Sequence, residues 1–256
     1  MIVELWTPQH IRTLLPALAV MLLIGLILRL TVGGKSLKIR MIPIQVIAMI
    51  LVLLEIGKQA VSFSRGYDLY HIPLHFCSLF IFVMPVMAFY RGKHQDHVFG
   101  VTSALCGSVF LLMLIYPNLI YGPWNVEGFF KDYLDFHTVA FHNLVMLAFV
   151  LIVALNLHTP GAKGENKAVI FFILGFCVVS ATMAQILKTN YANFYQCNVP
   201  PLEEVRLSLA GIIGVVPTQI LYVLILTVLN VLFVLGVYRL YCLLARVLAI
   251  PEKQKV

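Results

Sequence analysis

Long apolar stretches recur along the chain, and short polar segments separate them. Each is long enough for a helix to cross a hydrocarbon core of about 30 Å, which takes roughly 17–25 residues. Because water is absent from that core, backbone groups must bond within each segment, so the spans are predicted to be helices. Seven spans are expected, over residues 11–31, 42–63, 70–89, 98–116, 134–156, 167–187 and 216–247. The pattern predicts an all-α, polytopic membrane protein in which residues 1–256 form a single transmembrane helical domain.

The amino-acid composition agrees with a protein that is embedded largely in a lipid bilayer. Hydrophobic residues make up 61% of the chain and charged residues only 11%, whereas a soluble domain has about 25% charged residues. The first span has no basic segment before it and no A-x-A cleavage site, which favours a retained helix over a cleaved signal peptide. The chain is therefore expected in the cell membrane as a multipass integral protein.

The distribution of Lys and Arg predicts the orientation. Basic residues concentrate in the loops after the first, third and fifth spans and near the C-terminus, in a set formed by Arg29, Lys35, Lys38, Arg40, Arg91, Lys93, Lys163, Lys167, Arg239, Arg246, Lys253 and Lys255. The opposite side has fewer, and acidic residues dilute them. The positive-inside rule then places the N-terminus outside and the C-terminus inside. The net charge of +7 is explained as a topology signal, so no nucleic-acid partner is expected.

The cysteines match no disulfide framework or zinc motif. None of the five forms a C-x-x-C pair, and four lie in apolar spans, where cysteine usually behaves as a small hydrophobe. Cys197 alone lies in an outer loop, where it could be oxidised. No metal site and no cofactor are expected.

Polar residues within the spans gather at one depth. With a rise of about 1.5 Å per residue, one layer of the outer half receives groups from five spans: Glu55, Cys77, His142, Gln185, Asn190, Thr218 and Gln219. The inner half is expected to contain almost none. Ionisable groups in a span are costly and mark a site or pathway by default, so this layer is the candidate functional site.

Within the second span, Glu55, Lys58 and Gln59 have the i, i+3 and i+4 spacing of neighbours on one helix face. We expect a paired, partly buried unit that faces the bundle interior. A purely structural role for this unit is an equally good interpretation. On the third span, His71 is expected at the interface in contact with solvent.

Cys77 is the candidate nucleophile of the polar layer. As a helical neighbour two residues from His75, it would face about 200° away, so its base is expected from another span. His142 starts from the same side and reaches the same depth. His137, closer to the surface, is the second choice, and Asp135, two turns above His142, could orient the site through a water molecule.

Several segments resemble a known family. The stretches "LHFCSLFIF", "AFHNLVMLAFVLIV", "LKTNYANF" and "GVVPTQILYVLILTVLNVL" resemble, in order and spacing, the YwaF family of multipass membrane proteins, over about residues 42–240. That family is related to animal transmembrane protein 164, an ether-phospholipid acyltransferase. The resemblance implies a Cys nucleophile and a His base, which correspond to Cys77 and His142. A more distant similarity, to multipass hydrolases of branched fatty-acid esters, points to related chemistry.

The chemistry of these side chains agrees with the resemblance. An imidazole can take the proton of a thiol as the thiol attacks an acyl ester, and the oxyanion needs donors such as His75, Asn190, Tyr191 or Gln185. We therefore expect an acyltransferase or lipid hydrolase that acts on phospholipid or lysophospholipid esters, with membrane lipids as its partners. Two alternatives remain open. The same layer could recognise a solute in a transporter or binding protein, or His75 and His142 could be axial ligands of a haem.

Overall fold

The computed structural model describes residues 6–249, and throughout these residues the regular structure is helical. The α-helices are α1 (Pro8–Val32), α2 (Leu37–Arg40), α3 (Ile42–Ser64), α4 (Phe80–Phe89), α5 (Gln95–Ile115), α6 (Pro123–Gly128), α7 (Tyr133–Ala154), α8 (Glu165–Leu187), α9 (Pro200–Ile213) and α10 (Val215–Val247). Short 3-10 turns cover Leu69–His71, Cys77–Leu79, Pro117–Leu119 and Tyr191–Asn193.

Six of the described segments are long and apolar enough to cross a membrane: α1, the α2–α3 segment, α5, α7, α8 and α10. They fall where the sequence predicted six of the seven spans, with ends that differ by a few residues, as helix boundaries commonly do. A shorter apolar helix, Cys77–Phe89, lies between α3 and α5. The all-α polytopic fold expected from the sequence is confirmed.

The predicted third span, 70–89, is wrong in its first half. Regular α-helix begins only at Phe80, after a loop and a 3-10 turn. Proline has no N–H to donate, and its ring pushes the preceding residue out of the helical region. Ile72, just before Pro73, accordingly has ψ of 134°. The helical angle of 200° expected between His75 and Cys77 therefore does not apply, because His75 lies in the loop and Cys77 begins the 3-10 turn.

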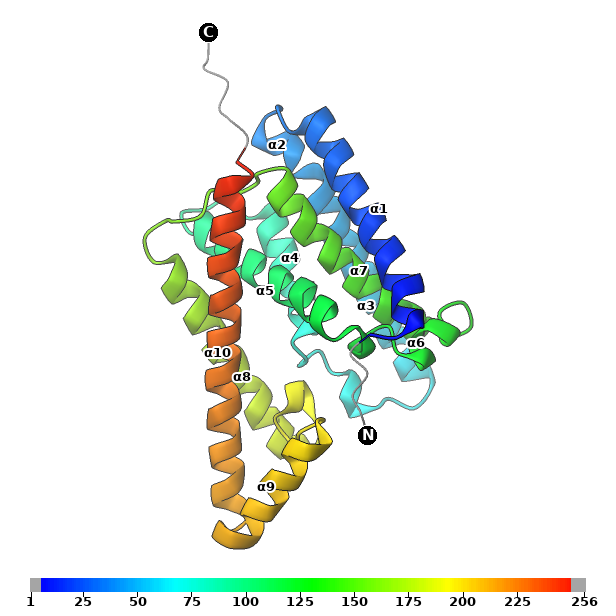
Figure 1. The fold of residues 1–256 in the computed structure, drawn as a ribbon, viewed down its shortest axis with the longest axis vertical. Helices are drawn as coiled ribbons and strands as arrows, with labels where there is room; N and C mark the ends of the chain where they lie inside the picture. The colour runs from blue at the N-terminus through cyan, green and yellow to red at the C-terminus, as the bar shows by residue number, and fades with distance from the viewer. Residues whose placement is uncertain (1–5, 250–256) are drawn as a thin grey trace.

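The bundle is built around α3, α5 and α7, with α1 packed on α7 and α4 packed against α3 and α5. The long helix α10 lies along α5 and α8, and α9 packs on α10 near the end where α10 begins (Figure 1). At Gly107 of α5, an added Cβ would come within 2.9 Å of both Phe149 and Val237. A residue without a side chain is thus what lets α7 and α10 approach α5 this closely.

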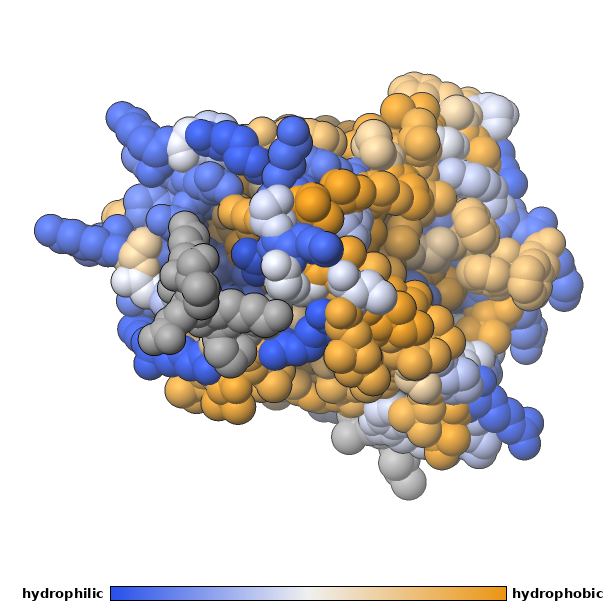
Figure 2. All heavy atoms as spheres, turned by 90° about the horizontal axis from the view of Figure 1, so that it is seen from above, coloured by the Kyte–Doolittle hydropathy of each residue, from blue (hydrophilic) through white to orange (hydrophobic). Residues whose placement is uncertain are grey.

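Basic residues close one end of the bundle. Arg29 donates to the Ala154 carbonyl at 2.9 Å, and Arg40 donates to the carbonyls of Leu155 and Asn156, each at 2.7 Å. These carbonyls end α7, where cations are favourable because the last carbonyls lack helical partners. Hydrophilic side chains gather on part of this end of the molecule, and hydrophobic side chains cover much of the rest (Figure 2).

The orientation remains a prediction with a direct test. Helix α1 begins at one end of the bundle and α10 ends at the other (Figure 1), as an odd number of crossings requires. Lys253 and Lys255, which entered the charge argument, lie outside the described residues. We expect a reporter fused before α1 to be extracellular and one fused after α10 to be intracellular. Reporters that place both ends on the same side would contradict the predicted topology.

Candidate functional site

A cavity of about 390 Å³ lies between α3, α5, α7, the loop before Cys77 and the loop after α8. Seven of the predicted site residues line it: Glu55, Lys58, His75, Cys77, His137, His142 and Asn190. They come from two long helices and two loops that are far apart in the sequence. The fold thus brings most of the predicted polar layer to one cavity.

Cys77 reaches this cavity from the first position of its 3-10 turn. Its thiol is free and half-buried. Lys58 lines the same cavity, where its ammonium nitrogen lies 3.1 Å from a Glu55 carboxylate oxygen. Cys77 and His142 share the cavity, and no hydrogen bond joins them in the described part of the chain.

His142 is held by its own helix in a defined tautomer. Its Nδ1 lies 2.6 Å from the Thr138 carbonyl oxygen. A carbonyl only accepts hydrogen bonds, so Nδ1 must carry the proton, and in the neutral ring Nε2 then carries the lone pair. The ring is 8% exposed and lines the cavity. In the neutral ring, Nε2 is therefore the nitrogen that can accept a proton.

The acidic residue of the cavity wall is paired, as the sequence predicted. Lys58 Nζ lies 3.1 Å from one Glu55 carboxylate oxygen, and Gln59 Nε2 donates to the same oxygen at 2.7 Å. His137 Nε2 lies 3.3 Å from the other oxygen. Glu55 is only 7% exposed, so the expectation of a partly buried unit that faces the interior is confirmed. His137, the second choice of base, belongs to this group.

Neutralising the Glu55 carboxylate should therefore lower the stability of the folded protein. Glu55→Gln keeps an acceptor for Gln59 but leaves the Lys58 ammonium without a counter-charge, and loss of a buried charged hydrogen bond costs about 1–3 kcal/mol. We expect a lower melting temperature in detergent. Glu127→Gln, at an exposed position, is the matched control. Equal melting curves and equal activity for both variants would show that the pair has no role.

Three of the four predicted oxyanion donors are already occupied. Tyr191 donates its hydroxyl hydrogen to the Leu69 carbonyl at 2.5 Å, and Gln185 donates to the Phe194 carbonyl at 2.9 Å. Burial lowers the pKa of His75 below its ordinary value, because desolvation disfavours imidazolium. The neutral His75 ring uses its Nε2 hydrogen on the Tyr70 carbonyl, 3.0 Å away. These three residues shape the loops around the cavity.

Asn190 keeps one donor available. Its Oδ1 accepts from the amides of Tyr195 and Gln196, and one Nδ2 hydrogen goes to Asn198. The second Nδ2 hydrogen has no partner among the described residues, and Asn190 lines the cavity. Asn190 therefore lines the cavity with a hydrogen left to offer, whereas Gln185 does not line it.

The remaining members of the predicted layer lie elsewhere. Asp135 Oδ2 packs against Gly128, closer than a Cβ there would allow, and is not among the residues that line the cavity. Thr218 donates to the Gly214 carbonyl, and Gln219 donates to the Phe194 carbonyl. Their contacts fix the start of α10 and the loop after α8 rather than the cavity.

The comparison with known families decides what kind of protein carries this cavity. The model of the TMEM164 family matches residues 5–251, nearly the whole chain. The chain belongs to the TMEM164 family. No curated protein and no solved structure matches it. The relation to transmembrane protein 164 that the sequence suggested is thereby confirmed, and this TMEM164-family chain is a multipass integral membrane protein.

Sequence reasoning missed part of the lining of the cavity in this TMEM164-family chain. Tyr70, Thr138, Asn193 and Asn198 also line it. Tyr70 is the first residue of the predicted span 70–89, where nothing marks it as polar lining, and the two asparagines lie in an irregular loop with no periodicity to interpret. The signal that was present is the density of Asn and Tyr after α8, which is typical of turns that tolerate unusual backbone angles.

A second buried polar cluster in the TMEM164-family chain corrects the expectation of an inner half almost without polar groups. Glu165, at the start of α8, is 1% exposed. One of its oxygens lies 3.0 Å from His158 Nε2, and the other accepts from the Gly161 amide at 2.9 Å and from the Tyr238 hydroxyl. His158 Nδ1 lies 3.2 Å from the Tyr241 hydroxyl. This carboxylate clasps the loop after α7 to α8 and α10.

Neither cluster resembles a metal centre. Among residues 6–249, no group of three or more His, Cys, Asp or Glu side chains could hold a metal ion. Cys197 lies in the loop after α8, where its amide donates to Glu203 at 2.9 Å. Its thiol is free, and its oxidation stays a prediction.

Proposed function

We propose that this protein is a membrane-embedded acyltransferase or lipid hydrolase that acts on acyl esters of phospholipids or lysophospholipids. Cys77 is the nucleophile and His142 is the general base. The observation that carries the proposal is the cavity that both residues line, where the Thr138 carbonyl leaves His142 Nε2 free to accept a proton. Membership of the TMEM164 family supports the same chemistry through the relation to an acyltransferase.

The first half of the reaction acylates the cysteine. His142 Nε2 takes the thiol proton, and the sulfur forms a bond to the ester carbonyl carbon. The carbonyl oxygen becomes an oxyanion, which the spare Asn190 hydrogen and the Lys58 ammonium can stabilise. When the carbon–oxygen bond breaks, the leaving alkoxide takes the proton from His142. The products are a thioester on Cys77 and a lysophospholipid.

The second half releases the acyl group. An acceptor hydroxyl gives its proton to His142 Nε2 as its oxygen attacks the thioester carbonyl. The carbon–sulfur bond then breaks, and the thiolate recovers the proton from the imidazolium. A lysophospholipid hydroxyl makes the protein a transferase, and water makes it a hydrolase. The proposal requires the Cys77 sulfur to reach Nε2 when substrate binds, and catalytic hydrogen bonds are often long before substrate binds.

The acyl-enzyme is the direct test. Purified protein incubated with phosphatidylcholine that carries a labelled acyl chain should acquire a label that hydroxylamine removes, because hydroxylamine cleaves thioesters. Peptide mass spectrometry should place the label on Cys77. Phospholipid binding without label on Cys77, in His142-intact protein, would instead favour the solute-binding alternative and contradict the enzyme.

A further inference from the structure

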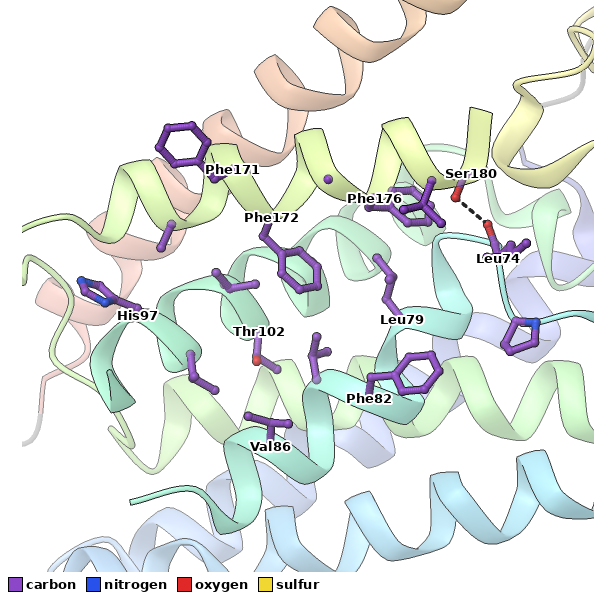
Figure 3. A pocket seen from close by; sticks show the side chains of 17 residues that line it. Leu74, Leu79, Phe82, Val86, His97, Thr102, Phe171, Phe172, Phe176 and Ser180 are labelled. Carbon is purple, nitrogen blue, oxygen red and sulfur yellow. Dashed lines mark hydrogen bonds between the residues drawn. The ribbon is translucent and has the colours of Figure 1, made fainter. Parts of the chain in front are cut away.

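A second and larger cavity, an apolar cleft of about 800 Å³, lies between α4, α5 and α8. Four phenylalanines dominate its lining: Phe82, Phe171, Phe172 and Phe176. Figure 3 shows His97 at one end of the cleft and Leu74 with Ser180 at the other. The two polar ends are already partnered, since Ser180 donates to the Leu74 carbonyl at 3.0 Å and His97 Nε2 lies 3.1 Å from the Lys163 carbonyl. The space between them suits a hydrocarbon.

The cleft adjoins the cavity of Cys77 through a thin wall. In the segment before α4, Pro73, Leu74 and Leu79 line the cleft, whereas His75, Cys77 and Ser78 line the smaller cavity. One stretch of backbone therefore separates the two spaces.

An aromatic pair marks the point of contact between the two spaces. Phe76 lines the cavity and Phe176 lines the cleft. Their ring centroids are 6.0 Å apart at 76°. A group attached to a carbonyl beside Cys77 would have to pass these two rings to enter the cleft.

The dimensions of the cleft match one leaflet. Its lining on α8 runs from Ala168 to Ser180, which corresponds to a rise of about 18 Å. Half of a hydrocarbon core is about 15 Å, the extent of an acyl chain. The outer rim includes Phe82 at 57% and Phe171 at 69% exposure, so the cleft opens sideways, toward the space that lipid occupies around a spanning bundle.

We infer that the cleft between α4, α5 and α8 holds the acyl chain of the phospholipid whose ester carbonyl lies beside Cys77. The inference rests on the proposed function for the position of the ester. It adds that α8 and α4, rather than the polar residues around Cys77, select the length of the chain. Selection is steric, because a lipid tail gains little by moving from bilayer to an apolar site and must be chosen by fit.

Gly175 offers a clean way to fill the cleft. It lines the cleft on α8, and a Cβ built there meets nothing within 4 Å. Gly175→Phe should therefore fold, with a gain in helix propensity over glycine, while its ring occupies the space for the chain. Gly236→Phe on α10 is the matched control, because Gly236 has equally open surroundings and does not line the cleft.

The experiment uses full-length protein in vesicles of phosphatidylcholine with one acyl chain that carries a diazirine and a terminal alkyne. With Cys77→Ala protein, which cannot turn over, we expect photocrosslinks concentrated on peptides of α4 and α8. They should fall about tenfold when Gly175→Phe is added, the scale expected when a bulky group overpacks an occupied space. Gly236→Phe should change nothing. In the active protein, Gly175→Phe should shift turnover toward short-chain esters.

The outcomes separate the two proposals. Crosslinks on α4 and α8 that Gly175→Phe removes support binding of the acyl chain in the cleft, whether or not Cys77 forms a thioester. If Cys77 never forms a thioester, only the proposed enzyme activity is contradicted. Crosslinks spread evenly over the outer surface, or unchanged by Gly175→Phe, indicate bulk lipid contact only and overturn the inference. If wild-type protein nevertheless forms the thioester on Cys77, the proposed enzyme activity stands and only the inference about the cleft is wrong.

Discussion

Replacing Cys77 with Ala should abolish acyl transfer or hydrolysis, and replacing His142 with Ala should do the same. The sulfur forms the bond to the acyl carbon, and Nε2 of His142 moves the proton in both halves of the proposed reaction. Nucleophile and base act as a unit, so each single loss is expected to be as severe as the double loss, in the range of about 10³-fold or more. Turnover of a labelled phospholipid in reconstituted vesicles measures this.

Two controls keep that result interpretable. Cys242→Ala removes another free and half-buried thiol that does not line the cavity, and it should keep full activity. Cys77→Ser retains a hydroxyl, which needs more activation than a thiol, and should keep at most a trace. If Cys77→Ala folds normally and turns over substrate at the wild-type rate, Cys77 is not the nucleophile.

Replacing Glu165 with Ala should cause the largest loss of stability. The carboxylate accepts from His158, Gly161 and Tyr238 in a site that is 1% exposed. Its removal leaves three donors without their acceptor, and each unsatisfied buried donor costs about 1–3 kcal/mol. We expect a much lower melting temperature in detergent, or protein that does not accumulate.

A graded series tests the cause of that loss. Tyr238→Phe removes one donor and leaves the carboxylate with two others, so its cost should be near 1 kcal/mol. Glu204→Ala, at an exposed position of α9, should be neutral. Equal melting temperatures for Glu165→Ala and Glu204→Ala would mean that the clasp contributes nothing to stability.

Hydropathy predicted the spanning helices well because each long helix is apolar over most of its length. It failed at residues 70–79 because hydropathy measures only how apolar a segment is. It does not register that Pro73 interrupts regular helix within an apolar run. Depth along the predicted helices still placed Glu55, Cys77 and His142 at one level, and the structure places all three around one cavity. The error in local structure therefore did not remove Cys77 from the site.

The hydrogen-bond partners of the polar side chains could not be predicted from the sequence. Tyr191 and Gln185 have the chemistry of oxyanion donors, but each donates to a carbonyl in a loop, and loop paths leave no periodic trace in a sequence. The Glu165 cluster escaped for a related reason. The predicted span begins at residue 167, so Glu165 falls in the loop before it. Tyr238, which donates to Glu165, and Tyr241, which contacts His158, fall inside the long apolar run predicted as the last span.

The shortness of α4 has a consequence for the bilayer itself. Its ten residues rise only about 15 Å, and the irregular backbone before it cannot face hydrocarbon, because unbonded amides and carbonyls are tolerated at that depth only beside protein or water. We therefore expect water and headgroups to reach toward residues 69–79 and the surrounding leaflet to thin there, as under hydrophobic mismatch. Such thinning would bring polar headgroups closer to Cys77.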